Sequence, residues 1–565
     1  MYPLLRLVVY WLILPTFGIS QESDLRQISL PFQEDARIKK AIQIRQSQRS
    51  ETFRQIRQSY TLDEAANEIL KLPAKDLIEK LQLRSLNATQ VLQAYMAKAI
   101  TVQDKFNCIT EFVPFALERA QNLDKLNAVR GPLHGIPVCV KDDHDVIVDT
   151  TMGLGKNLNM PASSNSVLTQ TLFDLGAVIF CKTNIPQTVF RYSSDNPIYG
   201  ETLHYRNEKL APGGSSSGTA SLLAGGGAVF ATGTDVAGSV RIPSHFSKLC
   251  TIKPTQKRLS DKGIKQTIPK LIGGGYKALL SNNLQNTYDS NAVPIPWNDE
   301  LFESKSPLKF GYYTSLSFFP AIGDTISTVL NAKKEFESLG HTFVPFKIEN
   351  DWDIVKLMYN VVGVDYGIDS HLNQLFSNEP PARGLEMIRS LCGQPDWKRW
   401  IDYQLSNATK LGSQDYSART ALFLQSGIHQ SRDRDVWDLI YQRDQLISKL
   451  LTQMQDDNLD LILAPVFPFA ACRINDTEPL FGATEYTMIW NFVDFPAGVI
   501  PFGIETGQNI DHYDDAGDAV LRLAKESTKD SIGSPIGIQI IGKPFKEEQV
   551  LRALNELFNK IDSKK

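Results

Sequence analysis

The chain has 565 residues, of which 42% are hydrophobic and 22% are charged, so it can bury a sizeable globular core. Its formal net charge of −4 at pH 7 gives no electrostatic footprint for nucleic acid as a partner. The six cysteines are scattered without a C-x-x-C pair, which indicates neither a metal site nor a dense disulfide framework.

Residues 1–20 (MYPLLRLVVYWLILPTFGIS) form the only hydrophobic segment long enough to address a membrane. The run is short for a spanning helix, which needs about 20 residues, and Gly18 and Ser20 supply the small residues of a signal-peptidase site. Residues 1–20 taken together could just span a membrane, so we predict a membrane anchor, with a cleaved signal peptide as the alternative. An anchored protein would be associated with an endomembrane such as the endoplasmic reticulum, whereas signal cleavage would give a secreted protein.

Residues 21–75 are predicted to form a basic helical arm. Between Arg37 and Arg57, seven Lys and Arg residues accompany the single acid Glu51, and apolar residues recur at helical spacing. The first interpretation is an ordinary helix whose apolar edge, including Phe53 and Ile56, docks on the body of the protein. The second is a helix on anionic lipid, because basic clusters beside a hydrophobic anchor are attracted to such a surface.

Residues 76–565 are predicted to form one large domain. Helical patterns at 62–71, 74–83 and 88–103 precede short β-rich runs at 136–140, 178–181, 461–463, 497–500 and 537–541, which alternate with further helical segments. This alternation predicts an α/β sheet sandwiched by helices. Asn87 is expected to begin a helix as its cap. Asn87, Asn407 and Asn475 are also glycosylation sequons, which matter only if the body lies in the secretory lumen.

Residues 211–255 have the most unusual composition of the chain. Small residues there let backbone amides approach a ligand, while apolar runs tie the segment into a core. No Gly-Lys-Ser/Thr or dinucleotide fingerprint follows the glycines, so we expect no nucleotide cofactor. Residues 214–218 fit the nucleophile-elbow pattern G-x-S-x-G, which would need a histidine from among His245, His371, His429 and His512.

A third interpretation uses two serines and a lysine. Ser215 lies in GGSSSG (213–218), Ser239 in GTDVAGSVRIP (233–243) and Lys141 in PVCVKD (137–142). These motifs resemble the amidase signature family, and within it they are most similar to the fatty-acid amide hydrolases. The segments that carry this second likeness are TNIPQ at 183–187, NPIYG at 196–200, KPTQKRLS at 253–260 and YTMIWNFVDFPAG at 486–498. Ala237 and Ser217 depart from the family, which usually has glycine at both positions.

The resemblance implies a single amidase domain with a twisted mixed sheet of about eleven strands between helix layers. It also implies an acyl-enzyme on Ser239, a charge relay through Ser215 to Lys141, and a cis peptide bond before Ser215. Lys141 can act as a base only when neutral, and full burial lowers a lysine pKa by up to about 3–5 units. A hydroxyl both donates and accepts, so Ser215 could pass the Ser239 proton to Lys141 and return a proton to the leaving amine.

The oxyanion is expected on the backbone amides of Val236, Ala237, Gly238 and Ser239, in a turn braced by Asp235 and Arg241. The methyl group of Ala237 leaves its amide free to donate. Val189 and Phe190 match a segment that lines the acyl channel in fatty-acid amide hydrolases.

The resemblance therefore implies an amidase for long-chain linear amides, namely N-acylethanolamines and primary fatty amides, that needs no metal and no cofactor. Its expected partners are the amide substrate and membrane lipid, and a homodimer is also envisaged. Two alternatives stay open: a hydrolase of smaller amides, and a non-catalytic lumenal homologue.

Overall fold

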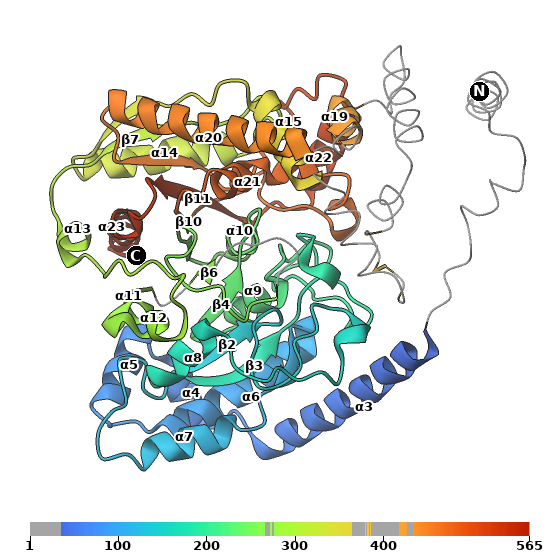
Figure 1. Cartoon of the computed structure of the whole chain (residues 1–565), viewed down its shortest axis with the longest axis vertical. Coiled ribbons are helices and arrows are strands. Elements are labelled where there is room, and N and C mark those ends of the chain that lie inside the picture. Colours follow the sequence, from blue (N-terminus) through green and yellow to red (C-terminus); the bar gives the residue numbers. More distant parts are fainter. Residues whose placement is uncertain are drawn as a thin grey trace, which may run out of the picture.

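The computed structural model describes residues 35–265, 272–273, 276–363, 379, 381–382, 385, 417–426 and 433–563. Two mixed β-sheets organise these residues into a lower and an upper half (Figure 1). The first sheet has the strand order β1 (Ile109–Phe112), β3 (Val178–Thr183), β2 (Pro137–Lys141), β4 (Phe230–Thr234) and β6 (Ile272–Gly273). The second has the order β5 (Thr251–Lys253), β10 (Ala497–Ile504), β11 (Pro535–Gly542), β9 (Leu461–Pro465), β7 (Lys309–Tyr312) and β8 (Thr342–Pro345).

Parallel and antiparallel pairs occur in both sheets. Strand β2 runs parallel to β3 and β4, whereas β1 is antiparallel to β3. In the second sheet β10, β11 and β9 are antiparallel neighbours, and β7 is parallel to β8 and β9. All five predicted strand runs coincide with strands of the structure. The prediction of an α/β fold with mixed strands is therefore confirmed.

The expectation of a single sheet of about eleven strands is not confirmed, because the described strands form one sheet of five and another of six. The chain turns out of β4 into an irregular loop and then into helix α10 (Arg241–Ser247) before it reaches β5. As a result, among the described residues β4 pairs on that side only with the two-residue strand β6, while β5 pairs with β10. The loop that separates the sheets is the one that contains Ser239.

Helices cover both sheets. α6 (Ala88–Phe106), α7 (Ala116–Asp124), α8 (Val167–Asp174) and α9 (Ser217–Ala224) contact the first sheet. α10, α14 (Thr325–Ser338) and α23 (Glu547–Asp562) contact the second. Apart from α3 (Ala36–Ser59), the other α-helices among the described residues are α4 (Glu64–Lys71), α5 (Ala74–Gln82), α11 (Tyr276–Leu279), α12 (Leu284–Tyr288), α13 (Asp299–Glu303), α15 (Asp351–Gly363), α19 (Ala418–Ser426), α20 (Asp433–Asp456), α21 (Glu485–Phe492) and α22 (Ala519–Lys529).

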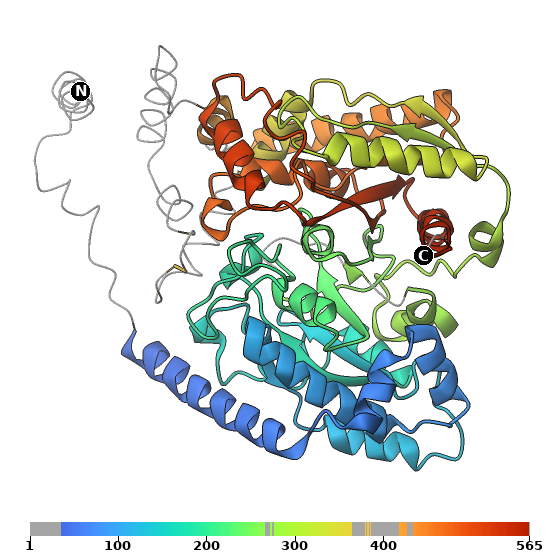
Figure 2. The same ribbon diagram turned by 180° about the vertical axis from the view of Figure 1, so that it is seen from behind.

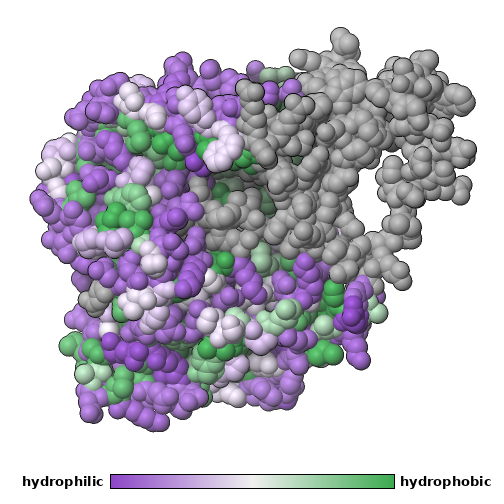
Figure 3. All heavy atoms as spheres, viewed as in Figure 1, coloured by the Kyte–Doolittle hydropathy of each residue, from purple (hydrophilic) through white to green (hydrophobic). Residues whose placement is uncertain are grey.

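Local sequence accounts for these elements and for their cores. Asn87 begins α6 with a capping box, in which its side chain accepts from the Gln90 amide and the Gln90 side chain accepts from the Asn87 amide, as predicted. Separate clusters of buried apolar side chains surround the first and the second sheet. Hydrophilic residues dominate the described part of the face seen in Figure 3, with apolar residues scattered among them. This distribution is ordinary for the outside of a globular fold.

The basic arm contains one long helix, α3 (Ala36–Ser59), which runs along the edge of the lower half (Figure 2). Its apolar edge is buried at Ile38, Ile42 and Phe53, as the docked-helix interpretation expects. Basic residues of the helix also contact the body: Arg45 pairs with Asp149 at 2.5 Å, Arg49 donates to two carbonyl groups of β1, and Arg57 forms an exposed pair with Asp104 of α6. The helix is therefore held by both apolar and charged contacts.

The predicted division into residues 1–20, 21–75 and 76–565 stays a prediction. Residues 1–20, with the proposed anchor or signal peptide, lie outside the described residues. Within the described ranges, no helix is both long enough and apolar enough to cross a membrane. Of the three sequons, Asn87 and Asn475 are exposed, and Asn407 lies outside the described residues.

Candidate active site

A pocket between the two sheets brings the two predicted serines together. Two of the residues that line it are Ser215, which follows the turn at Gly213 and Gly214, and Ser239, which lies in the loop after β4. The amide of Ser216 donates to the carbonyl oxygen of Ser239 at 3.0 Å, which ties the two segments directly. The peptide bond between Gly214 and Ser215 is cis, as the family resemblance implied.

Lys141, at the end of β2, reaches Ser215 from behind the pocket. Its Nζ donates to Ser215 Oγ at 2.8 Å and to Thr234 Oγ1 at 2.6 Å, and the side chain is fully buried. β2 lies next to β4, so its last residue is held beside Thr234, the last residue of β4. Burial lowers the pKa of Lys141 below its ordinary value, although the nearby Asp143 carboxylate opposes this shift.

Asp143 and Thr234 are site residues that the sequence reasoning missed. The Asp143 carboxylate lies 3.1 Å from Lys141 Nζ, accepts from Thr234 Oγ1 at 2.5 Å and contacts His144 Nδ1 at 2.7 Å. Burial alone would raise the pKa of Asp143, but the Lys141 charge and the hydrogen bonds with His144 and Thr234 hold it well below its usual range. Asp143 follows Lys141 by two residues and Thr234 precedes Asp235, yet neither spacing indicates that their side chains meet.

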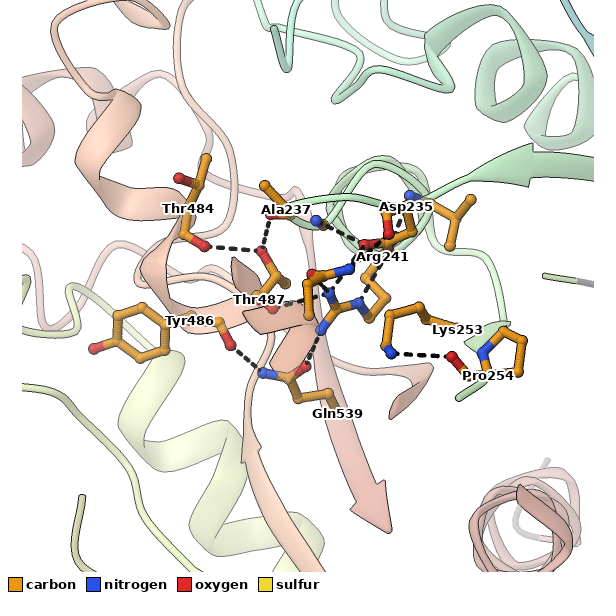
Figure 4. Close-up of polar contacts among 12 residues, drawn as sticks. Asp235, Ala237, Arg241, Lys253, Pro254, Thr484, Tyr486, Thr487 and Gln539 are labelled. Atoms are coloured by element: carbon orange, nitrogen blue, oxygen red, sulfur yellow. Dashed lines mark hydrogen bonds and ion pairs between the residues drawn. The ribbon is translucent and has the colours of Figure 1, made fainter. Parts of the chain in front are cut away.

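The turn that contains Ser239 is braced by a buried ion pair (Figure 4). Arg241 binds the Asp235 carboxylate, donates to the carbonyl oxygen of Thr487 at 2.9 Å and reaches Gln539 at 3.2 Å. Burial would raise the pKa of Asp235, but the Arg241 guanidinium holds it well below its usual range. The expected bracing by Asp235 and Arg241 is thus confirmed, and α21 and β11 complete it.

The four amides predicted to bind the oxyanion differ in their partners. The Gly238 amide donates to Asp235 Oδ1 at 2.8 Å, and Gly238 does not line the pocket. Val236, Ala237 and Ser239 do line it, and their amides have no acceptor among the described residues. Three of the four predicted donors are therefore free beside the pocket, while Gly238 is committed to shaping the turn.

Apolar side chains form part of the pocket wall. Val189 and Phe190 line the pocket with Phe481, and the Phe190 and Phe481 rings stack with centroids 5.7 Å apart. The pocket encloses about 60 Å³, well below the roughly 300–1,000 Å³ of pockets that hold drug-sized ligands. It therefore has room for a reacting carbonyl group, and a long acyl chain needs space beyond it.

A larger cavity, of about 600 Å³, lies on the other side of the same wall. It is lined by Ser216, Gly233 and Val240, each the chain neighbour of a residue that lines the smaller pocket. None of Lys141, Ser215 and Ser239 lines it. The smaller pocket is therefore the candidate active site.

The nucleophile-elbow alternative finds no support in the described residues. His245 is buried and uses both ring nitrogens, at 3.0 Å from the Phe469 carbonyl oxygen and 2.9 Å from the Gly537 amide. His512 is exposed, and His371 and His429 lie outside the described residues. Among the described residues no histidine lines the pocket, and no cluster of His, Cys, Asp or Glu could hold a metal ion.

The mixed α/β fold thus brings a serine loop, a braced turn with free amides and a buried lysine together beside one pocket, an arrangement suited to acyl transfer. The family model described as Amidase matches residues 90–551. The chain belongs to the amidase signature family.

Known relatives and solved structures agree with this assignment. Fatty-acid amide hydrolase 1 of Sus scrofa is 30% identical over 511 residues, covering 86% of each chain. Fatty acid amide hydrolase 1 of Caenorhabditis elegans is 30% identical and covers 86% of this chain and 87% of its own. Amidase 2 of Gibberella moniliformis is 29% identical, with 84% of this chain and 88% of its own covered. A solved structure of a fatty acid amide hydrolase shares the fold with a TM-score of 0.77 at 21% identity, covering 96% of this chain and 99% of that one.

Proposed function

We propose that this amidase hydrolyses long-chain amides, such as N-acylethanolamines and primary fatty amides, to a fatty acid and an amine. Ser239 is the nucleophile, and Ser215 and Lys141 relay its proton. The contact of 2.8 Å between Lys141 Nζ and Ser215 Oγ supports this assignment most directly, because it joins a buried lysine to a hydroxyl on the pocket wall. Hydrolysis of smaller amides is the second candidate.

In the proposed acylation step, Ser239 Oγ attacks the amide carbon while its proton passes to Ser215 and the proton of Ser215 passes to Lys141. The negative oxygen of the tetrahedral intermediate is bound by the free amides of Val236, Ala237 and Ser239, where each donor typically contributes about 10²–10³ in rate. The relay then runs backwards and protonates the leaving nitrogen, which is too basic to depart as an anion. Water hydrolyses the resulting ester by the same relay.

Two observations support a long acyl chain as the substrate. The pocket wall is apolar at Val189, Phe190 and Phe481, and relatives similar over most of the chain are named fatty-acid amide hydrolases. Each methylene buried on an apolar wall contributes about 0.8 kcal/mol, so chain length can be selected without a charged contact. Association with membrane lipid through residues 1–20 belongs to the same proposal.

The nucleophile is tested by labelling with a fluorophosphonate. Ser239→Ala is expected to abolish both labelling and hydrolysis. Ser216→Ala is the matched control, since the Ser216 side chain lines the larger cavity and its backbone contact with Ser239 survives the change. Full-rate labelling of the Ser239 variant would refute the assignment.

The substrate class is tested with primary amides from acetyl to oleoyl. We expect kcat/KM to rise along the series as more methylene groups are buried. Rates that fall from the shortest amide onward would favour the second candidate. The identity of the nucleophile and the substrate class are tested independently, because fluorophosphonate labelling does not depend on the acyl chain of the substrate.

A further inference from the structure

The lysine at the end of β2 has three polar partners. Lys141 Nζ lies 2.8 Å from Ser215 Oγ, 2.6 Å from Thr234 Oγ1 and 3.1 Å from Asp143 Oδ2. An ammonium group has three N–H donors and no acceptor, so these three oxygens satisfy the charged form completely. The neutral form, which the proposed relay requires, has two N–H donors and one lone pair.

The partners of Lys141 differ in what they can give. Thr234 has one hydroxyl hydrogen, and it donates this to Asp143 Oδ2 at 2.5 Å, so toward Lys141 it can only accept. The Asp143 carboxylate has no hydrogen and can also only accept. When Lys141 is neutral, its two hydrogens therefore stay with Thr234 and Asp143. The lone pair is left facing Ser215, the one partner with a hydrogen to donate.

Asp143 is itself held in place. Its Oδ1 contacts His144 Nδ1 at 2.7 Å, and its carbonyl oxygen accepts from the Lys265 amide at 2.8 Å. His144 is fully buried, and its Nε2 has no hydrogen-bond partner among the described residues. A doubly protonated ring would bury a second N–H without an acceptor, so the neutral ring with its hydrogen on Nδ1 fits this site. His144 then donates to Asp143 and fixes the rotation of the carboxylate.

We propose that Asp143 is a positioning residue for the amidase reaction: it turns the lone pair of neutral Lys141 toward Ser215 and, through its charge, sets the pH at which that neutral form appears. This inference rests on the proposed relay and deepens it. Asp143 does not take up the Ser215 proton, which goes to Lys141.

The other charged groups around Lys141 have partners of their own. Asp142 pairs with Lys182 of β3 at 3.0 Å, and Asp235 pairs with Arg241 of α10 at 3.0 Å. Lys265, on the pocket wall, has the Asp145 carboxylate at 4.0 Å, and α9 contributes no charged residue. Asp143 is thus the carboxylate in direct contact with Lys141. Burial lowers the pKa of Lys141, whereas the negative charge of Asp143 raises it.

The decisive measurement is the pH dependence of fluorophosphonate acylation in the full chain. Asp143→Asn removes the charge that favours the ammonium form, so the rate should reach its plateau at a pH lower by about 1–3 units. The plateau itself should fall by about tenfold or more, because an amide at this position can donate to the lone pair and turn it away from Ser215. Asp145→Asn is the matched control, since it removes a nearby charge that does not contact Lys141. Both the pH at which the rate reaches its plateau and the plateau rate should stay as in the unchanged protein.

Each contrary result has a definite meaning. An unchanged inflection pH in Asp143→Asn would overturn the electrostatic role, and an unchanged plateau would overturn the positioning role. His144→Asn keeps a donor for Asp143 without a titrating ring, so loss of the inflection in that variant would assign it to His144 and overturn the inference. If Asp143→Asn does not fold, Thr234→Val decides the positioning role, because it removes one of the two acceptors and should also lower the plateau about tenfold.

Lys141→Ala separates this inference from the proposal beneath it. Acylation at the normal rate in that variant would refute the relay itself. A slow Lys141 variant together with an unaltered Asp143→Asn variant would refute only the role of Asp143.

Discussion

Arg241 donates hydrogen bonds to both carboxylate oxygens of Asp235, through its Nε and one terminal nitrogen, at 3.0 Å each. Both side chains are fully buried. The same carboxylate accepts from the amides of Gly238 at 2.8 Å and Val240 at 3.2 Å, on either side of Ser239. The ion pair therefore fixes the shape of the turn that presents the nucleophile and the free amides.

Arg241→Met is expected to destabilise the protein by about 3–5 kcal/mol, because it leaves a buried carboxylate without its cation. The exposed pair of Arg57 and Asp104 offers a control: Arg57→Met should cost at most about 1 kcal/mol. Thermal unfolding midpoints at neutral pH compare the two variants. Equal losses in both would contradict the role assigned to Arg241.

The same pair makes a prediction for acid. The pKa of Asp235 is lower in the folded protein than its ordinary value, so its contribution to stability is present at neutral pH. That contribution is lost as the pH falls below about 3.9, the value for an unfolded aspartate, toward the lower folded value. Asp235→Asn should be less stable than the unchanged protein at neutral pH and should lose less stability on acidification. A parallel decline of both proteins would argue against this reading.

Lys141→Ala should slow amide hydrolysis more than ester hydrolysis. An alkoxide leaves with less help from a proton than an amine does, so a relay that protonates the leaving group matters more for amides. The measurement is kcat/KM for an oleoyl amide and the matched oleoyl ester in both proteins. Equal losses for the two substrates would limit Lys141 to activating Ser239.

Gly238→Ala is expected to lower the acylation rate by about a hundredfold or more, the scale of losing an oxyanion donor. Gly238 has a φ of +119°, and a Cβ placed there would lie 2.2 Å from Thr487 Oγ1. The turn must therefore shift to admit a methyl group. Ala237→Gly, one residue earlier, restores the family's usual residue and should change the rate by less than about threefold, since the amide is retained. If Gly238→Ala acylates at the normal rate, the close approach of Gly238 to Thr487 does not shape the turn.

His245→Ala and His512→Ala should each leave fluorophosphonate acylation within about tenfold, because a missing general base costs about 10²–10⁴. Burial lowers the pKa of His245 to about 4, and both its ring nitrogens are engaged away from the pocket. The acylation rate is to be compared in folded samples, with circular dichroism as the control for folding. A loss of a hundredfold or more in either variant would revive the nucleophile-elbow interpretation.

The sequence alone determined features that depend on neighbours along the chain. The strand runs and the cap at Asn87 follow from hydrophobic spacing and from local residue types, and the structure confirms both. The motifs around Lys141, Ser215 and Ser239 were identified by their resemblance to the amidase signature family, and their catalytic roles stay a proposal. The pair of Asp235 and Arg241 was also foreseeable, because six positions separate them around one turn.

Tertiary structure decided what depends on contacts between distant segments. Thr487 and Asn491 of α21 support the Ser239 turn across some 250 positions of sequence, and the break between β4 and β5 divided the expected single sheet in two. The protonation state of Lys141 also depends on contacts between distant segments. Its donors meet Ser215, Thr234 and Asp143 only because β2, β4 and the glycine turn come together, and the free energy of a buried amine depends on every oxygen within hydrogen-bond reach.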